Sequence, residues 1–318
     1  MFLELGRDPV VLVPSNFGND TNFAAVGSKD PGHLGGAGTY AAVGASLAAD
    51  SGEVGIVAKV GWDEHDRIAA EFEEHGVSTE ALTEHPVPTP RSTLQYLPDG
   101  ERVEIPQHGE SHFDSLTPMP ADIPNSWTEL KGIYLFHDTD PTYWDAVQSY
   151  RAEHDVTILW EISAVSCVPE QWDAVSRILQ TVDAFSINRT EALSLCGTEL
   201  IAVAADRLGA SGTTIFLRLG EQGSVIIRGK DNWAVAPVSG SVVDPTGGGN
   251  SYSGAALVEF IRAAGDPVSA SRAASAAASQ IIGQFGLPPV GTEQRRRLAK
   301  EAEAAELKDP KLLLLERH

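Results

Sequence analysis

The residues best suited to chemistry lie in one glycine-rich stretch, residues 241–255, which reads SVVDPTGGGNSYSGA. Adjacent glycines let the backbone approach a ligand closely, and the helix that is expected to begin here adds its positive end. A tight turn alone would not require Asp, Thr and Asn beside three glycines. It is not a Walker A loop, because Asn250 and Ser251 stand where that motif has Lys and Ser or Thr. The stretch predicts a site for a group that carries or develops negative charge, such as a phosphoryl group in transfer. Its candidate residues are Asp244, Thr246, Gly247, Gly248, Gly249 and Asn250.

A second pattern joins an amide and a carboxylate three residues apart. Asn188 and Glu191 follow an apolar run that is typical of a buried strand. The simple interpretation is a helix cap with an acid in the first helical turn. The functional interpretation is a pair of oxygen ligands for Mg²⁺, which keeps several of its waters in protein sites. Taken alone, the pair is better explained as a helix cap. The glycine-rich stretch in the same chain favours the interpretation as a metal site.

The elements that must position these residues alternate between strand and helix. Apolar strand patterns at 132–138, 157–163, 184–188 and 213–219 are separated by helical patterns at 141–154, 171–179 and 190–196. This alternation predicts a mostly parallel, doubly wound α/β sheet with helices on both faces. Residues 10–13 are predicted to be a buried central strand, and the apolar run 312–315 a last short strand or a dimer contact. Between 89 and 107 two alternating segments flank a Pro-Asp-Gly turn, which predicts a β-hairpin.

The order of these motifs resembles the ribokinase/PfkB family of carbohydrate kinases. The glycine-rich stretch is similar to that family's signature, and residues 60–63 (VGWD) and Asn188 to Glu191 match two more of its motifs. Residues 218–224 (RLGEQGS) resemble a nucleotide-lining segment, in which Gly220 and Gly223 match and Arg218 replaces the usual Thr. The resemblance implies ATP and Mg²⁺ as cofactors, with a monovalent cation as a further option. It implies that Asn188 and Glu191 hold the metal and that Arg218, Gly220, Gly223 and Thr246 bind the nucleotide.

The resemblance also implies one ribokinase-like domain over 1–318 with a small β-sheet lid, contributed by about 16–32 and 88–110. Asp20, Gly35, Gly36, Tyr40 and Asn250 would then bind the substrate, a sugar or a nucleoside. Arg218 could contact phosphate or point outward, and Tyr40 could stack on a ring or fill the pocket. An exposed lid often pairs between subunits in the family, which predicts a homodimer. A G-x-G-x-x-A match at Gly36 is discounted as a dinucleotide motif, since no strand precedes it.

Asn250 is the main departure from the family pattern. The family has an Asp there, which takes the proton from the acceptor hydroxyl, and an amide cannot act as a base at neutral pH. Gly247, Gly248 and Gly249 would stabilise the developing charge, with Asp244 as a substitute base or a partner of the metal or loop. Three explanations stand: a natural branch with weak activity or another base, a nucleotide- or sugar-binding relative without catalysis, and an engineered Asp→Asn change. The first two are favoured because Arg218 and Gly248 also depart from the pattern.

Composition limits the partners of the chain. It has 318 residues, a net charge of -21, and 44 acidic against 23 basic side chains. Such a surface should repel nucleic acid and anionic membranes. Cys167 and Cys196 form no CxxC pair, so no disulfide framework or zinc site is expected. Without a signal-peptide pattern or a membrane span in the sequence, a cytoplasmic location is predicted.

Overall fold

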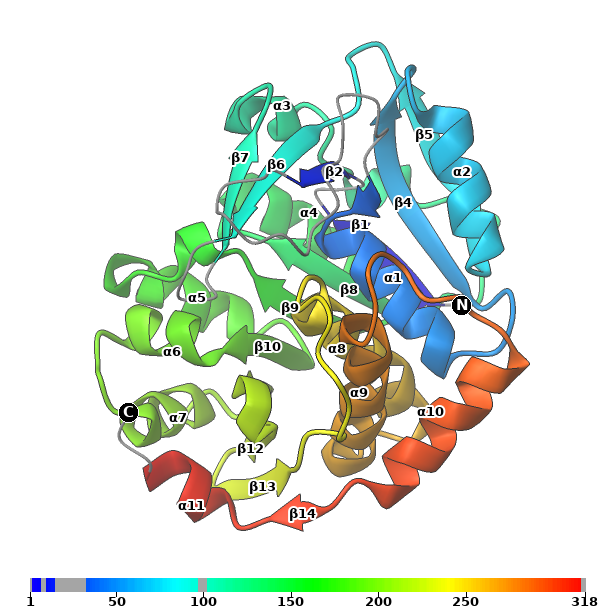
Figure 1. Ribbon diagram of the computed structural model, residues 1–318. Coiled ribbons are helices and arrows are strands. Elements are labelled where there is room, and N and C mark those ends of the chain that lie inside the picture. The colour runs from blue at the N-terminus through cyan, green and yellow to red at the C-terminus, as the bar shows by residue number, and fades with distance from the viewer. Residues whose placement is uncertain (1, 7–9, 15–32, 97–101, 316–318) are drawn as a thin grey trace.

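The computed structural model describes residues 2–6, 10–14, 33–96 and 102–315, and its centre is a ten-stranded sheet (Figure 1). The strand order is β14-β13-β12-β11-β10-β9-β8-β1-β4-β5. Neighbours from β11 to β5 pair in parallel, whereas β12, β13 and β14 continue the sheet in antiparallel fashion. The strands are β1 (Phe2–Gly6), β4 (Val54–Gly61), β5 (Val77–His85), β8 (Gly132–His137), β9 (Thr157–Ile162), β10 (Ala184–Asn188), β11 (Thr214–Arg218), β12 (Ser224–Arg228), β13 (Asp231–Val235) and β14 (Leu307–Lys308).

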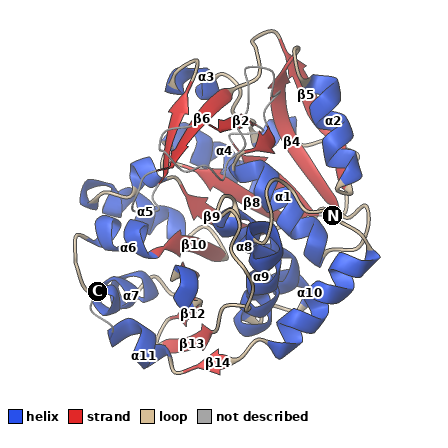
Figure 2. Ribbon diagram, in the orientation of Figure 1, coloured by secondary structure: helices blue, strands red, loops and turns tan. Residues whose placement is uncertain are grey.

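Helices cover both faces of this sheet (Figure 2). One face packs against α1 (Ala37–Ala48), α2 (His65–Glu74), α8 (Gly248–Arg262) and α9 (Pro267–Ile282), and α10 (Thr292–Ala304) lies outside them. The other face packs against α4 (Pro141–Glu153), α5 (Trp172–Leu179), α6 (Arg189–Cys196), α7 (Ile201–Gly209) and α11 (Pro310–Leu315). A short helix, α3 (Glu110–Asp114), follows the hairpin. The predicted doubly wound, mostly parallel α/β sheet is therefore confirmed.

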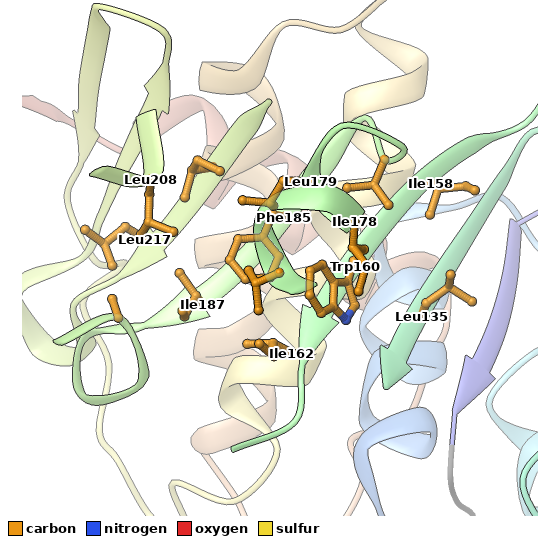
Figure 3. Packing of buried hydrophobic residues seen from close by; sticks show 14 of the residues in the cluster. Leu135, Ile158, Trp160, Ile162, Ile178, Leu179, Phe185, Ile187, Leu208 and Leu217 are labelled. Carbon is orange, nitrogen blue, oxygen red and sulfur yellow. The ribbon is translucent and has the colours of Figure 1, made fainter. Parts of the chain in front are cut away.

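The core on the α5 face shows why the strands are so apolar. Ile158, Trp160 and Ile162 of β9 point to that face and meet Phe185 of β10 and Ile178 of α5 (Figure 3). Trp160 is fully buried, with its ring centroid 4.7 Å from that of Phe185. Full burial of each such side chain contributes about 1.5–3 kcal/mol. Because alternate residues of a strand point to opposite faces, the residues between them must face α8.

A second, four-stranded sheet has the order β3-β2-β6-β7. Its strands are β2 (Val10–Pro14), β3 (His33–Gly35), β6 (Arg91–Tyr96) and β7 (Arg102–Pro106). The pairing of β6 with β7 is antiparallel, so the predicted hairpin is confirmed. The small sheet is also confirmed, whereas the predicted lid segment 16–32 lies outside the described residues. The assignment of residues 10–13 to the main sheet was wrong: they belong to the small sheet, and Phe2–Gly6 takes the central place between β4 and β8.

One of the two alternatives for the C-terminal run, a short strand, was wrong, and the other, a dimer contact, stays a prediction. The run 312–315 lies in α11, not in a strand. Asp309 accepts a hydrogen bond from the N–H of Lys311 at the start of this helix, and Leu313 packs into the core against the α7 side. A short apolar run does not distinguish a strand from one buried helical face, and here the preceding Asp-Pro starts a helix. Among the residues that the structure describes, no helix is long and apolar enough to span a membrane.

Candidate active site

The candidate site lies where four parallel strands end. Tyr134 of β8, Glu161 of β9 and Arg218 of β11 have the same orientation as the sheet residues that pack on α8, namely Leu159 and Phe216. The register places Asn188 beside Arg218. Since the carboxyl ends of parallel strands meet at one edge, the residues at or next to the ends of β9, β10 and β11 gather there, and Tyr134 reaches them with its hydroxyl from within β8. This edge is also where α8 begins, so strand ends and helix start form one site.

The glycine-rich turn opens α8. Thr246 donates its backbone N–H to Oδ1 of Asp244 at 2.9 Å, which closes the turn before the glycines. Gly247 has a φ of 77°, a conformation that favours glycine, and a Cβ there would lie 2.1 Å from the ring of Tyr40. Within the described part of the chain, the N–H groups of Gly249 and Asn250 have no hydrogen-bond acceptor. These groups, at the positive end of a 15-residue helix, can receive an anion.

Arg218 lies directly beneath this turn. A Cβ on Gly249 would come within 1.8 Å of its Nη1 atom, so only glycine allows the guanidinium to approach the backbone this closely. The Arg218 side chain is 11% exposed, and its Nε is buried without a hydrogen-bond partner among the described residues. The alternative that Arg218 points outward is therefore wrong. Its charge adds to the positive end of α8, and both attract an anion at the turn.

A buried carboxylate, Glu161, holds the centre of the site. Its Oε1 accepts from Nη2 of Arg218 at 2.7 Å and from Nδ2 of Asn250 at 3.2 Å, and its Oε2 accepts from the Tyr134 hydroxyl at 2.8 Å. Nδ2 of Asn250 also lies 3.3 Å from that hydroxyl. Glu161 is only 3% exposed, so these three donors replace the water that a carboxylate would otherwise need. Asn250 is thereby joined to Arg218 through one shared carboxylate.

The charges of the site are coupled. Burial by itself would lower the pKa of Arg218, but Glu161 and Glu191 outweigh it, and the pKa is raised. Burial raises the pKa of Glu191, and the nearby Arg218 opposes this only in part, at 3.8 Å from Oε2. Arg218 thus stays positive beneath the glycine turn, while Glu191 is the carboxylate that burial makes costly to ionise.

Comparison with known proteins fits this geometry. A family model described as pfkB family carbohydrate kinase matches residues 27–291. The chain belongs to the pfkB family. Among curated relatives, an uncharacterized protein of Schizosaccharomyces pombe is 31% identical over 160 residues, which span 41% of this chain and 44% of the relative. The chain therefore spans less than half of that relative's length. An uncharacterized sugar kinase of Archaeoglobus fulgidus is 26% identical over 218 residues, or 66% of this chain and 84% of the relative.

Solved structures of other kinases share the fold of this pfkB-family chain. A Vibrio cholerae fructokinase with fructose, ADP and calcium superposes with a TM-score of 0.71 at 17% identity, over 93% of this chain and 98% of that one. A Methanocaldococcus jannaschii nucleoside kinase gives 0.69 at 18% identity, over 94% and 98%. An Escherichia coli chain assigned as a ribokinase II, in complex with ATP and Mg²⁺, gives 0.71 at 18% identity, over 94% and 98%. At these identities the likeness shows the ribokinase-like fold.

The pair Asn188 and Glu191 forms the cap that the simple interpretation predicted. Oδ1 of Asn188 accepts from the N–H of Glu191, and Oε2 of Glu191 accepts from the N–H of Asn188, both at 2.9 Å. Oε1 of Glu191 takes no part in these two hydrogen bonds and is a hard oxygen donor, of the kind that a hydrated Mg²⁺ contacts through its waters. Within the described residues, no group of three or more His, Cys, Asp or Glu side chains could hold a metal directly. The capping box therefore fixes the carboxylate of Glu191 against the backbone of Asn188.

The remaining predicted residues lie around this centre. Gly35 ends β3, so the expectation that no strand precedes Gly36 was wrong, and Gly36 is the N-cap of α1 with a φ of 103°. Tyr40 of α1 is buried against the glycine turn rather than at an open surface. Gly220 and Gly223 bound the tight turn between β11 and β12, next to Arg218. Asp20 lies outside the described residues.

Two residues of the site were missed from the sequence. Glu161 and Tyr134 carry no family motif in our sequence analysis, yet they anchor Asn250 and Arg218. A signal was present: Glu161 is the one charged residue in the apolar run TILWEI. A charge inside a buried strand requires partners, so its position predicts a polar network.

A separate hollow of about 440 Å³ lies at the other end of α8. Arg262, Arg272 and Arg295 line it, together with residues of α1, α9 and α10. The 15-residue length of α8 places it about 20 Å from the glycine turn. It includes none of the predicted site residues.

Proposed function

We propose that this protein transfers the γ-phosphoryl group of MgATP to a hydroxyl of a sugar or a nucleoside. The observation that carries the proposal is the glycine turn at the start of α8, with the guanidinium of Arg218 beneath Gly249. Backbone N–H groups, the helix end and a permanent cation converge there on one small volume. Such an arrangement stabilises the charge that develops on a phosphoryl group as it moves.

The roles follow from position. The acceptor oxygen attacks the γ-phosphorus, the bond from that phosphorus to the bridging oxygen of ADP breaks, and ADP leaves with the electron pair. Gly247, Gly248, Gly249 and Arg218 would stabilise the transferring group. Mg²⁺, when bound, neutralises phosphate charge, and Asn188 and Glu191 would hold its waters.

The other predicted residues take places around the reacting groups. Thr246, Gly220 and Gly223 would line the nucleotide, and Asp244 would fix the turn. Asp20, Gly35, Gly36 and Tyr40 would bound the substrate pocket. The small sheet would act as the lid that excludes water, and pairing of two copies through it remains a prediction.

Asn250 sets the expected rate. Its amide cannot take a proton, so the acceptor proton would pass to water or to a phosphate oxygen. Loss of a general base costs on the order of 10² to 10⁴ in rate. Each well-placed donor to the developing charge contributes on the order of 10² to 10³. Because positioning and charge stabilisation supply most of phosphoryl-transfer catalysis, the proposal is a slow kinase rather than an inactive one.

A second candidate function is binding of nucleotide or sugar without turnover. Asn250 favours it, because its side chain is an amide that cannot act as a base and that is already hydrogen-bonded to Glu161 and Tyr134.

Free buried thiols at Cys167 and Cys196 support the further proposal of a cytoplasmic location.

The test is ADP release from MgATP in the presence of pentoses, hexoses, sugar phosphates and nucleosides. Acceptor-dependent release by the unmodified protein supports the kinase and names its substrate class. Tight MgATP binding with no acceptor-dependent release supports the binding protein. If neither MgATP nor any acceptor of the panel binds in titration calorimetry, both candidates are wrong.

A further inference from the structure

The contacts of Asn250 fix which way its amide points. Nδ2 faces Glu161 and Tyr134, and a carboxylate can only accept hydrogen bonds, so the nitrogen must be on that side. The carbonyl oxygen of the same planar amide therefore points away from Glu161. In that direction it can accept a hydrogen bond from a bound group.

A carboxylate at position 250 could not make the hydrogen bond to Glu161 that the amide makes. A carboxylate oxygen in the place of Nδ2 would lie 3.2 Å from Oε1 of Glu161, and neither oxygen could donate. Arg218 is already engaged by Glu161 at 2.7 Å and faces Glu191 at 3.8 Å. Two carboxylates this close in a buried site cannot both ionise without a large cost. Glu161 thus already supplies the carboxylate that lies nearest to both Arg218 and position 250.

We propose that Glu161 is a positioning residue: together with Tyr134 it orients the amide of Asn250 toward the acceptor hydroxyl, and its charge makes position 250 selective for an amide over a carboxylate. The role toward the acceptor rests on the proposed kinase function, whereas the amide selectivity does not. Restoring the family's Asp at position 250 alone therefore yields a strained site instead of a better catalyst. The carboxylate and the amide must exchange places for an Asp to fit.

The first experiment is this exchange, measured as thermal stability. Asn250→Asp lowers Tm, and Glu161→Gln lowers Tm because Arg218 loses its nearest carboxylate. The double variant Glu161→Gln/Asn250→Asp recovers, because the introduced Gln amide can donate to the introduced carboxylate and Arg218 regains a buried carboxylate nearby. Its Tm is higher than the sum of the two single shifts predicts. Additive shifts overturn the proposal.

A second measurement keeps the test independent of whether the double variant folds well. Among the described residues, the titratable groups that contact the side chain of Asn250 are Glu161 and Tyr134; Arg218 is paired with Glu161, and Glu191 lies 3.8 Å from Arg218. Beside Glu161, the carboxyl group introduced by Asn250→Asp binds its proton more tightly in the folded state than in the unfolded state. The Tm deficit of Asn250→Asp relative to the natural protein therefore grows as pH rises from about 5 to about 8. Asn232→Asp, the same change at an exposed position of β13, shows no such growth, and an equal deficit at both pH values for Asn250→Asp contradicts the proposal.

Activity provides the third arm. In acceptor-dependent ADP release, Asn250→Asp gains nothing in kcat over the natural protein, while the exchanged double variant gains about 10²-fold or more, since its introduced Asp can serve as a base. A gain by Asn250→Asp alone overturns the proposal. If all variants lack turnover but the Tm cycle is non-additive, the amide selectivity stands and the kinase function is wrong.

Discussion

Replacing Gly249 by Ala should show whether Arg218 lies as close to the glycine turn as the structure places it. The new methyl group would lie 1.8 Å from Nη1 of Arg218, whereas ordinary contact needs about 3.5 Å. The guanidinium must move by well over an ångström, which is enough to break its 2.7 Å contact with Glu161. The end of an arginine side chain is flexible in general, but here burial and Glu161 hold it.

The magnitude combines two opposing effects. Breaking a buried ion pair and leaving its charges uncompensated costs about 3–5 kcal/mol. Ala gains about 1 kcal/mol over Gly inside a helix, which leaves a net loss of about 2–4 kcal/mol. For a chain of this size, about 2 °C per kcal/mol converts that loss to a Tm lowered by about 4–8 °C.

The assay is thermal denaturation followed by circular dichroism, with Gly248→Ala as the matched control. A methyl group on Gly248 would meet only Cγ2 of Ile282 among the described residues, at 2.8 Å, so a shift of well under an ångström in that partly buried side chain accommodates it. The control should change Tm by about 2 °C or less, since overpacking and helix propensity nearly cancel. In an Arg218→Ala background the Gly249→Ala change should cost nothing further. Equal losses for Gly248→Ala and Gly249→Ala, or the same loss in both backgrounds, would refute the placement of Arg218.

Three further predictions concern the same region and the thiols. Gly247→Ala places a Cβ 2.1 Å from the Tyr40 ring at a φ of 77°. It should therefore lower the free energy of unfolding by about 2–5 kcal/mol, as measured by urea unfolding. An unchanged free energy of unfolding would contradict the contact between Gly247 and Tyr40. Burial raises the pKa of Cys167 to about 12 and that of Cys196 to about 11, so neither thiol should react with iodoacetamide at about pH 8 until the protein is unfolded, as mass spectrometry will show. Burial raises the pKa of Glu191 above its usual 4.5, so the folded state binds its proton more tightly and stability falls as pH rises from about 4.5 through the folded pKa. The Tm of Glu191→Gln should therefore gain on the natural protein over that interval, and a constant difference would argue against the burial of Glu191.

Much of the fold could be predicted because each strand carries its own pattern. The β-α alternation from Gly132 onward reads directly as a doubly wound sheet, and the Pro-Asp-Gly turn reads as a hairpin. Residues 2–6 and 10–14 could not be assigned this way. Both are short apolar runs, and which of them enters the main sheet depends on long-range pairing with β4 and β8, which local pattern does not encode.

The candidate site was predictable only where residues act through the backbone. The glycine turn and the capping box of Asn188 and Glu191 depend on local geometry, which spacing specifies. The direction of Arg218 and the role of Glu161 depend on which strands lie side by side. A charged residue in an apolar strand could have indicated that a partner must exist, but the identity of that partner required the register of β9, β10 and β11.

The central claim is that this sheet edge transfers a phosphoryl group. Its most direct test is incubation of the unmodified protein with γ-³²P-labelled ATP, Mg²⁺ and each acceptor, followed by chromatography of the products. The account predicts slow appearance of a labelled sugar or nucleoside phosphate, and a further large loss of that product with Arg218→Ala, which removes the cation beneath the glycine turn. Transfer that is unchanged in Arg218→Ala, or label that remains in ATP with every acceptor although MgATP binds, would contradict it.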